Sequence, residues 1–159
     1  MTPAMQTVSN TFGLGDRLFH EGVATLGDDE ARRAVVDNTN PAVWLAGHLL
    51  NSRKYLLELF GENRELPWES KFRDKYDPST EYPAMSELAS AWTDISESLR
   101  SRMAQASESD FSREIDWELP NGDKTVRGAL LFYAYHEAWH LGQIAYARKG
   151  MGKEGLVRR

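Results

Sequence analysis

The chain has 159 residues, of which 41% are hydrophobic and 27% charged, a composition that predicts one soluble globular domain over residues 1–159. A formal net charge of −5, without any basic stripe, argues against a nucleic-acid-binding protein. Because cysteine is absent, disulfides, thiolate metal ligands and a cysteine nucleophile are excluded. No signal peptide and no apolar run of the roughly 20 residues needed to cross a bilayer is recognisable. We therefore expect a cytoplasmic protein that does not enter the membrane.

The first half of the chain predicts two helices. Apolar residues at near-helical spacing indicate a first helix over residues 3–25, which three glycines weaken. A polar connection with a short helical turn follows. Asn40 as the N-cap and Pro41 at the first helical position then begin a second helix that runs to Phe60, with Gly61 just beyond its end. The apolar residues of this helix surround it, which predicts that neighbouring elements cover it well.

Two long connections separate the remaining helices. Residues 62–82 are polar, aromatic and interrupted by proline, which predicts a long loop or a lid with a short helix packed on the bundle. A stripe of apolar residues with helical spacing predicts a third helix over residues 84–106. Residues 107–124 contain an Asn-Gly turn, so we expect an extended segment or a small hairpin there. Thr125 then caps the last helix over residues 126–149, and a loose basic tail follows.

These elements predict an all-α fold. Four helices of roughly 20 residues with two long connections are typical of an up-down four-helix bundle. Side chains from facing helices of such a bundle often assemble metal sites in its core.

His136 and His140 lie four residues apart on the last predicted helix. This spacing places both imidazoles on one face of the helix. The face is otherwise mostly apolar, so the rings should point into the bundle, where two imidazoles without a shared proton or a metal are hard to satisfy. The alternative, in which each ring is an ordinary polar residue with its own hydrogen bond, has less weight. The pair therefore indicates a metal site.

His48, in the middle of the second predicted helix, is the best third ligand, although a lone buried histidine is more often simply hydrogen-bonded. His20, the remaining histidine, is predicted to be a surface or boundary residue. Three neutral imidazoles favour zinc, nickel, iron or cobalt over magnesium or calcium. Such a set with an open fourth position is the catalytic arrangement, because the ion can acidify a water or coordinate an external anion. Candidates for lining the open position are Trp44, Trp68, Phe72, Tyr133 and Gln143.

The segment from His136 to His140 also matches His-Glu-x-x-His, the motif of zinc peptidases in which the glutamate is the general base. The extended peptidase motif needs Gly at 143 and His at 146, where this chain has Gln143 and Tyr146. We also expect no sheet edge to bind a peptide, so the peptidase interpretation ranks below the bundle. Glu137 then has three candidate roles: a base acting on metal-bound water, a group that orients an imidazole, or the ion-pair partner of an arginine.

Taken together, three segments resemble the DinB-like superfamily, also called the DinB/YfiT superfamily. They are NPAVWLAGH at residues 40–48, TVR at residues 125–127 and HEAWHLGQI at residues 136–144. The resemblance implies a four-helix bundle with one divalent ion, zinc or nickel, held by His48, His136 and His140. It also implies frequent homodimers.

Members of this family include transferases that use low-molecular-weight thiols, such as bacillithiol transferases and mycothiol-dependent isomerases. The resemblance thus implies a thiol-dependent S-transferase that acts on a small-molecule substrate. An open His₃ ion could bind a thiol, lower its pKa and present a thiolate to an electrophile. Because the chain lacks cysteine, the thiol would come from a cofactor or substrate. Two alternatives stay open: a hydrolase with metal-activated water, and a non-catalytic metal-binding stress or sensor protein.

Overall fold

The computed structural model describes residues 2–156, and this part of the chain folds into four long helices and three short ones. The long helices are α1 (Pro3–Val23), α3 (Ala42–Leu59), α4 (Met85–Gln105) and α6 (Val126–Gly150). The short ones are α2 (Asp28–Ala31), the 3₁₀ helix η1 (Glu69–Phe72) and α5 (Glu108–Ser112). Within the described residues, no helix is long and apolar enough to span a bilayer.

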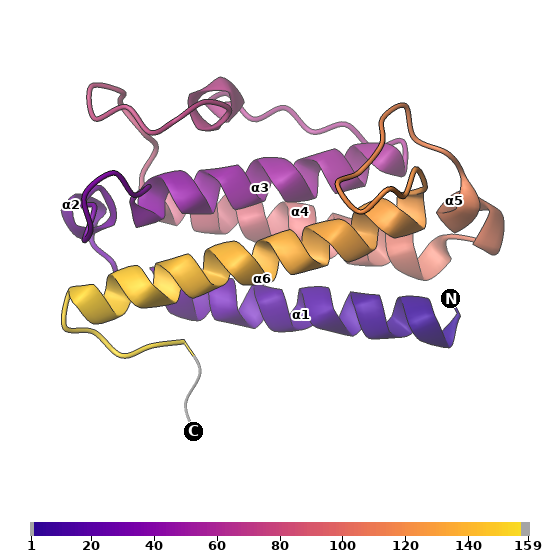
Figure 1. The fold of residues 1–159 in the computed structure, drawn as a ribbon, viewed down its shortest axis with the longest axis horizontal. Helices are drawn as coiled ribbons and strands as arrows, with labels where there is room; N and C mark the ends of the chain where they lie inside the picture. Colours follow the sequence, from indigo (N-terminus) through magenta and orange to yellow (C-terminus); the bar gives the residue numbers. More distant parts are fainter. Residues whose placement is uncertain (1, 157–159) are drawn as a thin grey trace.

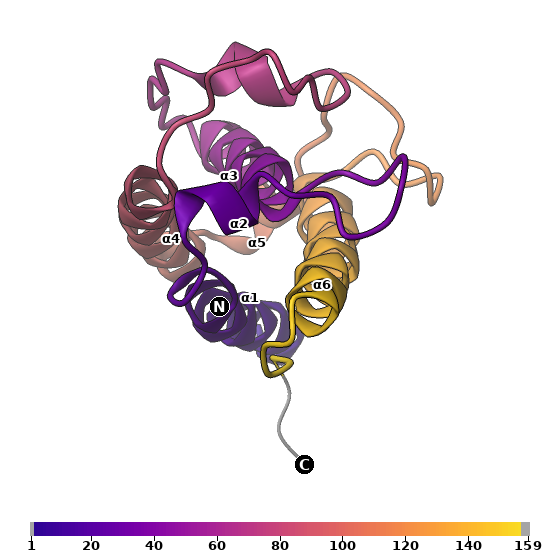
Figure 2. The same cartoon turned by 90° about the vertical axis from the view of Figure 1, so that its left-hand side faces the viewer.

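The four long helices form a bundle around a common core (Figure 2). Helices α1 and α3 each pack against both α4 and α6. The all-α four-helix bundle with long α3–α4 and α4–α6 connections is therefore confirmed. The direction of the chain reverses from α1 to α3 and from α4 to α6, whereas α3 and α4 run parallel (Figure 1). These two helices are parallel because the connection between them returns along the length of the bundle (Figure 1). The predicted up-down order, in which successive helices alternate in direction, is therefore wrong for this pair.

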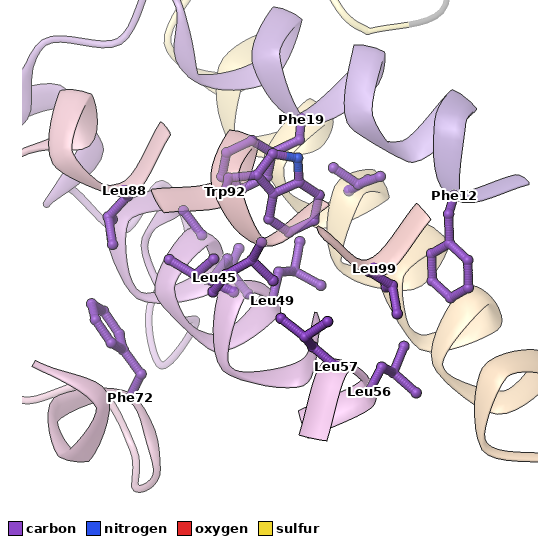
Figure 3. Close-up of a cluster of buried hydrophobic side chains, with 14 of the residues drawn as sticks. Phe12, Phe19, Leu45, Leu49, Leu56, Leu57, Phe72, Leu88, Trp92 and Leu99 are labelled. Carbon is purple, nitrogen blue, oxygen red and sulfur yellow. The ribbon is translucent and has the colours of Figure 1, made fainter. Parts of the chain in front are cut away.

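The core lies between the four long helices, and Figure 3 shows the leucine and aromatic side chains that α1, α3 and α4 contribute to it. Phe19 of α1 stacks on Trp92 of α4, with ring centroids 3.9 Å apart and an interplanar angle of 5°. Helix α3 is covered on three sides, by α4, α6 and η1. This coverage explains why its apolar residues do not form a single stripe.

Gly47 of α3 lies against the ring of Phe72 in η1. A β-carbon at this position would lie 2.3 Å from the ring of Phe72. We expect Gly47→Ala to lower the free energy of unfolding by about 1–3 kcal/mol, because overpacking forces the ring or the helix to move. Gly13→Ala on α1 is the matched control. A β-carbon there meets open space, so this change should raise stability by about 0.5–1 kcal/mol. Urea denaturation measures the stability of both variants. A Gly47→Ala variant that is as stable as the wild type would contradict the contact between Gly47 and Phe72.

Several helix ends differ from the prediction by one or two residues: α1 ends at Val23, α3 ends at Leu59, and α4 runs from Met85 to Gln105. Pro41, rather than Asn40, is the N-cap of α3, and the helix begins at Ala42. The reason is that the Pro41 backbone is extended while its carbonyl already accepts the first helical hydrogen bond, from Leu45. Gly150 is the last residue of α6 rather than the first beyond it.

The prediction of a loose tail is wrong for residues 153–156. Leu156 is buried and packs beside Gly22 of α1. The Arg148 side chain donates hydrogen bonds to the carbonyls of Glu154 (3.1 Å) and Gly22 (3.0 Å). The apolar side chain of Leu156 and these bonds fix the tail against α1. The rest of the predicted tail, residues 157–159, lies outside the described residues.

The connection before α6 contains the predicted small hairpin. A single bridge pairs Glu114 with Thr125, and Gly122 provides the turn with a φ of +80°. The short helix α5, which precedes the hairpin, was not predicted; Ser107 caps it. Thr125 is the N-cap of α6, as expected, and its side-chain oxygen accepts a hydrogen bond from the Gly128 amide.

Candidate metal centre

Three histidines converge where α3 and α6 pack side by side. His48 lies in the middle of α3, and His136 and His140 lie on adjacent turns of α6. The Nε2 atom of His136 is 3.1 Å from Nε2 of His48 and 3.1 Å from Nε2 of His140. One nitrogen from each ring lies within 4.8 Å of the others. The structure therefore brings together the three histidines that the sequence singles out as ligands.

A hydrogen bond on the far side of the His140 ring orients it. Nδ1 of His140 lies 2.6 Å from Oε1 of Gln143. Because an amide oxygen accepts, Nδ1 carries the proton and Nε2 presents its lone pair to the cluster. The Phe72 backbone lies beside the ring of His48 and opposes the lowering of its pKa by burial. Nδ1 of His136 is buried without a partner among the described residues.

The histidine rings are neutral at physiological pH. Burial, with smaller contributions from the neighbouring His140 and His48, lowers the pKa of His136 to about 4. Burial is also the main cause of the lowered pKa of His48 and of His140. The Nε2 atoms of these neutral rings face one another at 3.1 Å, a spacing at which two rings either share a proton or bind a metal together. Zinc–nitrogen distances of about 2.0–2.1 Å in a tetrahedron separate ligand nitrogens by about 3.3 Å. The three residues thus fit a divalent ion.

Aromatic rings surround the cluster. Trp44 stacks on His48, with ring centroids 4.8 Å apart and an interplanar angle of 11°. Tyr133 meets His136 edge-on, with centroids 5.6 Å apart. Of the five residues predicted to line the open position, Trp44, Tyr133, Gln143 and the Phe72 backbone contact a histidine. Trp68 instead contacts the ring of Phe72, so it lies in a second layer.

Two further residues near the cluster, Tyr55 beside Tyr133 and Trp117 beside Tyr55, were not predicted. The indole Nε1 of Trp117 donates a hydrogen bond to the hydroxyl of Tyr55, at 2.6 Å. The ring of Tyr55 packs against Tyr133, with centroids 5.5 Å apart. Burial raises the pKa of Tyr133 to about 12, with a smaller contribution from Tyr55, so the Tyr133 hydroxyl keeps its proton. Tyr55 could have been found from its spacing, because seven residues separate it from His48, two turns along one face of α3.

Glu137 is paired with an arginine. Its side chain is 5% exposed, and its two carboxylate oxygens accept hydrogen bonds from Nε and Nη2 of Arg53, at 2.8 and 2.7 Å. Burial raises the pKa of Glu137, while the Arg53 guanidinium opposes this shift. A general base must reach the proton that it removes within hydrogen-bond distance, and here both oxygens bind Arg53. Of the three candidate roles, the geometry shows the ion pair.

His20 lies outside the cluster, as expected for a residue that is not a ligand. It sits on α1, and its Nε2 atom is 3.3 Å from the hydroxyl of Thr93 on α4. The group of residues arranged to hold a metal contains His48, His136 and His140 and does not include His20.

Two solved structures have a similar fold. A conserved protein from Enterococcus faecalis is 19% identical, with a TM-score of 0.72 over 96% of this chain and 100% of that chain. YfiT from Bacillus subtilis, described as a probable metal-dependent hydrolase with an unusual four-helix bundle topology, is 14% identical, with a TM-score of 0.73 over 97% of this chain and 91% of that chain. No curated protein sequence matches. The family model of the DinB superfamily matches residues 15–144, a span that includes the three converging histidines. The chain therefore belongs to the DinB superfamily.

Proposed function

We propose that the protein is a metal-dependent enzyme whose divalent ion is held by His48, His136 and His140. The observation that carries this proposal is the convergence of three neutral rings. The Nε2 atom of His136 lies 3.1 Å from that of His48 and 3.1 Å from that of His140. Zinc or nickel suits a set of imidazole ligands without carboxylate. The three rings are only half-buried, which supports an ion that a small molecule can reach.

A thiol-dependent S-transferase is the activity that we propose. The bound ion would supply an open position at which a thiol loses its proton. Since the chain has no cysteine, that thiol belongs to a small-molecule substrate or cofactor. Tyr133 retains its proton and packs against His136, so it serves as a hydrogen-bond donor to the electrophile. Trp44, which stacks on His48, and Tyr55, which packs against Tyr133, provide apolar surfaces beside the proposed substrate site.

A hydrolase is the second candidate, and the description of YfiT favours it. In that case the ion would activate a water molecule instead of a thiol. The pairing of Glu137 with Arg53 means that such a hydrolase would need a different base. The third candidate is a non-catalytic metal-binding protein.

Assays of zinc-loaded and nickel-loaded protein separate these candidates. One panel contains low-molecular-weight thiols with electrophiles, and the other contains esters and amides. Metal-dependent consumption of thiol that His136→Ala abolishes and His20→Ala preserves would support the transferase. Hydrolysis of an ester or amide without consumption of thiol would select the hydrolase. If chelation unfolds the protein and neither panel turns over, the metal has a structural role.

We also propose that the protein is a homodimer that associates through the outer face of α6. This face exposes Leu131, Tyr135, Trp139 and Tyr146, each by 49–65%. The exposed residues from 128 to 148 are all uncharged. Exposed aromatic residues without charge are typical of the centre of a protein interface. Two copies with a net charge of −5 each would meet with least repulsion through this neutral face.

Trp139→Lys is expected to weaken the dimer by about 30-fold or more, because it removes a central aromatic residue and places a charge in the interface. Sedimentation velocity over a range of concentrations measures the dissociation constant. Ser90→Lys, on the exposed face of α4, is the matched control and should leave the dimer intact. A wild-type protein that stays monomeric would contradict the proposal, as would equal effects of the two variants.

A further inference from the structure

Arg53 links all four long helices of the bundle. Its side chain lies on α3 and is 1% exposed. The guanidinium holds Glu137 of α6 through two hydrogen bonds and donates to the carbonyl of Phe12 on α1 at 3.0 Å. It also donates to the carboxylate of Asp16 on α1 and to the hydroxyl of Ser96 on α4. These bonds use all five N–H donors of the arginine.

The charges of this network balance. Asp16 also accepts a hydrogen bond from Arg100, at 2.9 Å, so two arginines meet two carboxylates. The guanidinium of Arg53 also lies over the ring of Trp92, 3.8 Å from its centroid. Burying such a network costs desolvation, and apolar residues of similar volume often stabilise a fold equally well. Stability alone therefore does not account for it. The two parallel hydrogen bonds from the guanidinium fork of Arg53 to the carboxylate of Glu137 also fix the position of these two groups relative to each other.

The position that the fork fixes is that of the metal ligands. Arg53 follows His48 by five residues on α3, and Glu137 is adjacent to His136 on α6. The 3.1 Å separation of His48 and His136 crosses between the helices, so it depends on their register. The separation of His136 and His140 lies within one helix and does not. Metal sites tolerate deviations in ligand distance of only about 0.2 Å.

We infer that Arg53 and Glu137 are positioning residues that set the register of α3 and α6 and thereby the geometry of the three-histidine metal centre. This inference rests on the proposed function, because it requires that the histidines bind an ion. Neither Arg53 nor Glu137 touches the ion; both act through the backbone of the helices that carry the ligands.

Gly15 gives an independent way to move Glu137. A β-carbon on Gly15 of α1 would lie 1.7 Å from Oε1 of Glu137. Gly15→Ala thus displaces the carboxylate, or pushes α1 away, without removing a charge or a metal ligand. Gly13→Ala is the matched control on the same helix, because nothing lies within 4 Å of a β-carbon at that position.

The experiment measures the affinity for cobalt(II) and its visible ligand-field spectrum, which reports coordination geometry. The main variant combines Arg53→Met with Glu137→Leu and replaces the pair with apolar side chains of similar size. We expect this variant to fold, to bind cobalt about 10–100-fold more weakly, as for the loss of other groups that orient ligands, and to show an altered spectrum. Gly15→Ala should change affinity and spectrum in the same direction, and Gly13→Ala should match the wild type.

Loss of stability alone should not produce this result. Phe111→Ala removes a buried ring in α5, away from the network, and should bind cobalt with the wild-type affinity and spectrum. If the double variant does not fold, Arg53→Lys decides, because it retains the charge and loses the fork. A folded double variant or Arg53→Lys variant with the wild-type affinity and spectrum would overturn the inference while leaving the metal centre intact. A wild-type protein that binds no cobalt would instead overturn the proposed function.

Discussion

Replacing His48 with alanine is expected to lower the affinity for zinc by more than about 100-fold, since losing only a group that orients a ligand typically costs about 10–100-fold. His48 is the single histidine that α3 contributes to the cluster, and its Nε2 atom lies 3.1 Å from that of His136. The remaining pair on α6 would hold an ion through two nitrogens of one helix. Competition between the protein and a chromophoric chelator measures the change.

His20→Ala is the matched control for this variant. His20 lies on α1 and contacts Thr93, so its removal should leave the affinity for zinc unchanged. Circular dichroism of both variants would establish that the helices are retained. If His48→Ala binds one zinc ion per chain with the wild-type affinity, His48 is not a ligand.

Glu137→Ala is expected to lower the free energy of unfolding by about 3–5 kcal/mol, because removing one partner of a buried ion pair leaves the other charge without compensation. The guanidinium of Arg53 would lose two hydrogen bonds, and its side chain is 1% exposed. Asp16 would remain as its only carboxylate partner among the described residues. Urea denaturation of the metal-free protein isolates this effect from any change in metal binding.

Glu97→Ala provides the comparison for the loss of a glutamate. Glu97 is exposed on α4, and removing it should change stability by no more than about 0.5 kcal/mol. A change for Glu137→Ala as small as that for Glu97→Ala would show that the buried ion pair does not form in solution.

The long helices could be predicted because each has a periodic apolar pattern or a clear cap. Helix α3 has apolar residues all round, and this predicted the coverage that α4, α6 and η1 provide. The parallel arrangement of α3 and α4 could not be predicted, because a connection of that length can lead to either end of the bundle. Helix α5 has five residues, too few for a periodic signal. The docking of the tail depends on the burial of Leu156 and on the hydrogen bonds that Arg148 donates to the carbonyls of Glu154 and Gly22, which are tertiary effects.

The convergence of the three histidines could be predicted for a local reason and a non-local one. His136 and His140 share a face of one helix, which their spacing shows directly. The choice of His48 depended on the expectation that two buried helices face each other and on the family resemblance. Arg53 was missed as the partner of Glu137, although an arginine in the middle of a helix with apolar residues all round indicates a buried ion pair. Trp117 was missed because a hairpin brings it to Tyr55.

X-ray absorption spectroscopy of the zinc-loaded protein tests most directly whether the three histidines form an open metal centre. We expect three imidazole nitrogens at about 2.0–2.1 Å and one further ligand that exchanges when a small thiol is added, with sulfur then appearing in the coordination shell. An ion bound by fewer than three imidazoles, or one closed by a fourth protein ligand that no thiol displaces, would contradict the assignment of these residues as an open catalytic centre.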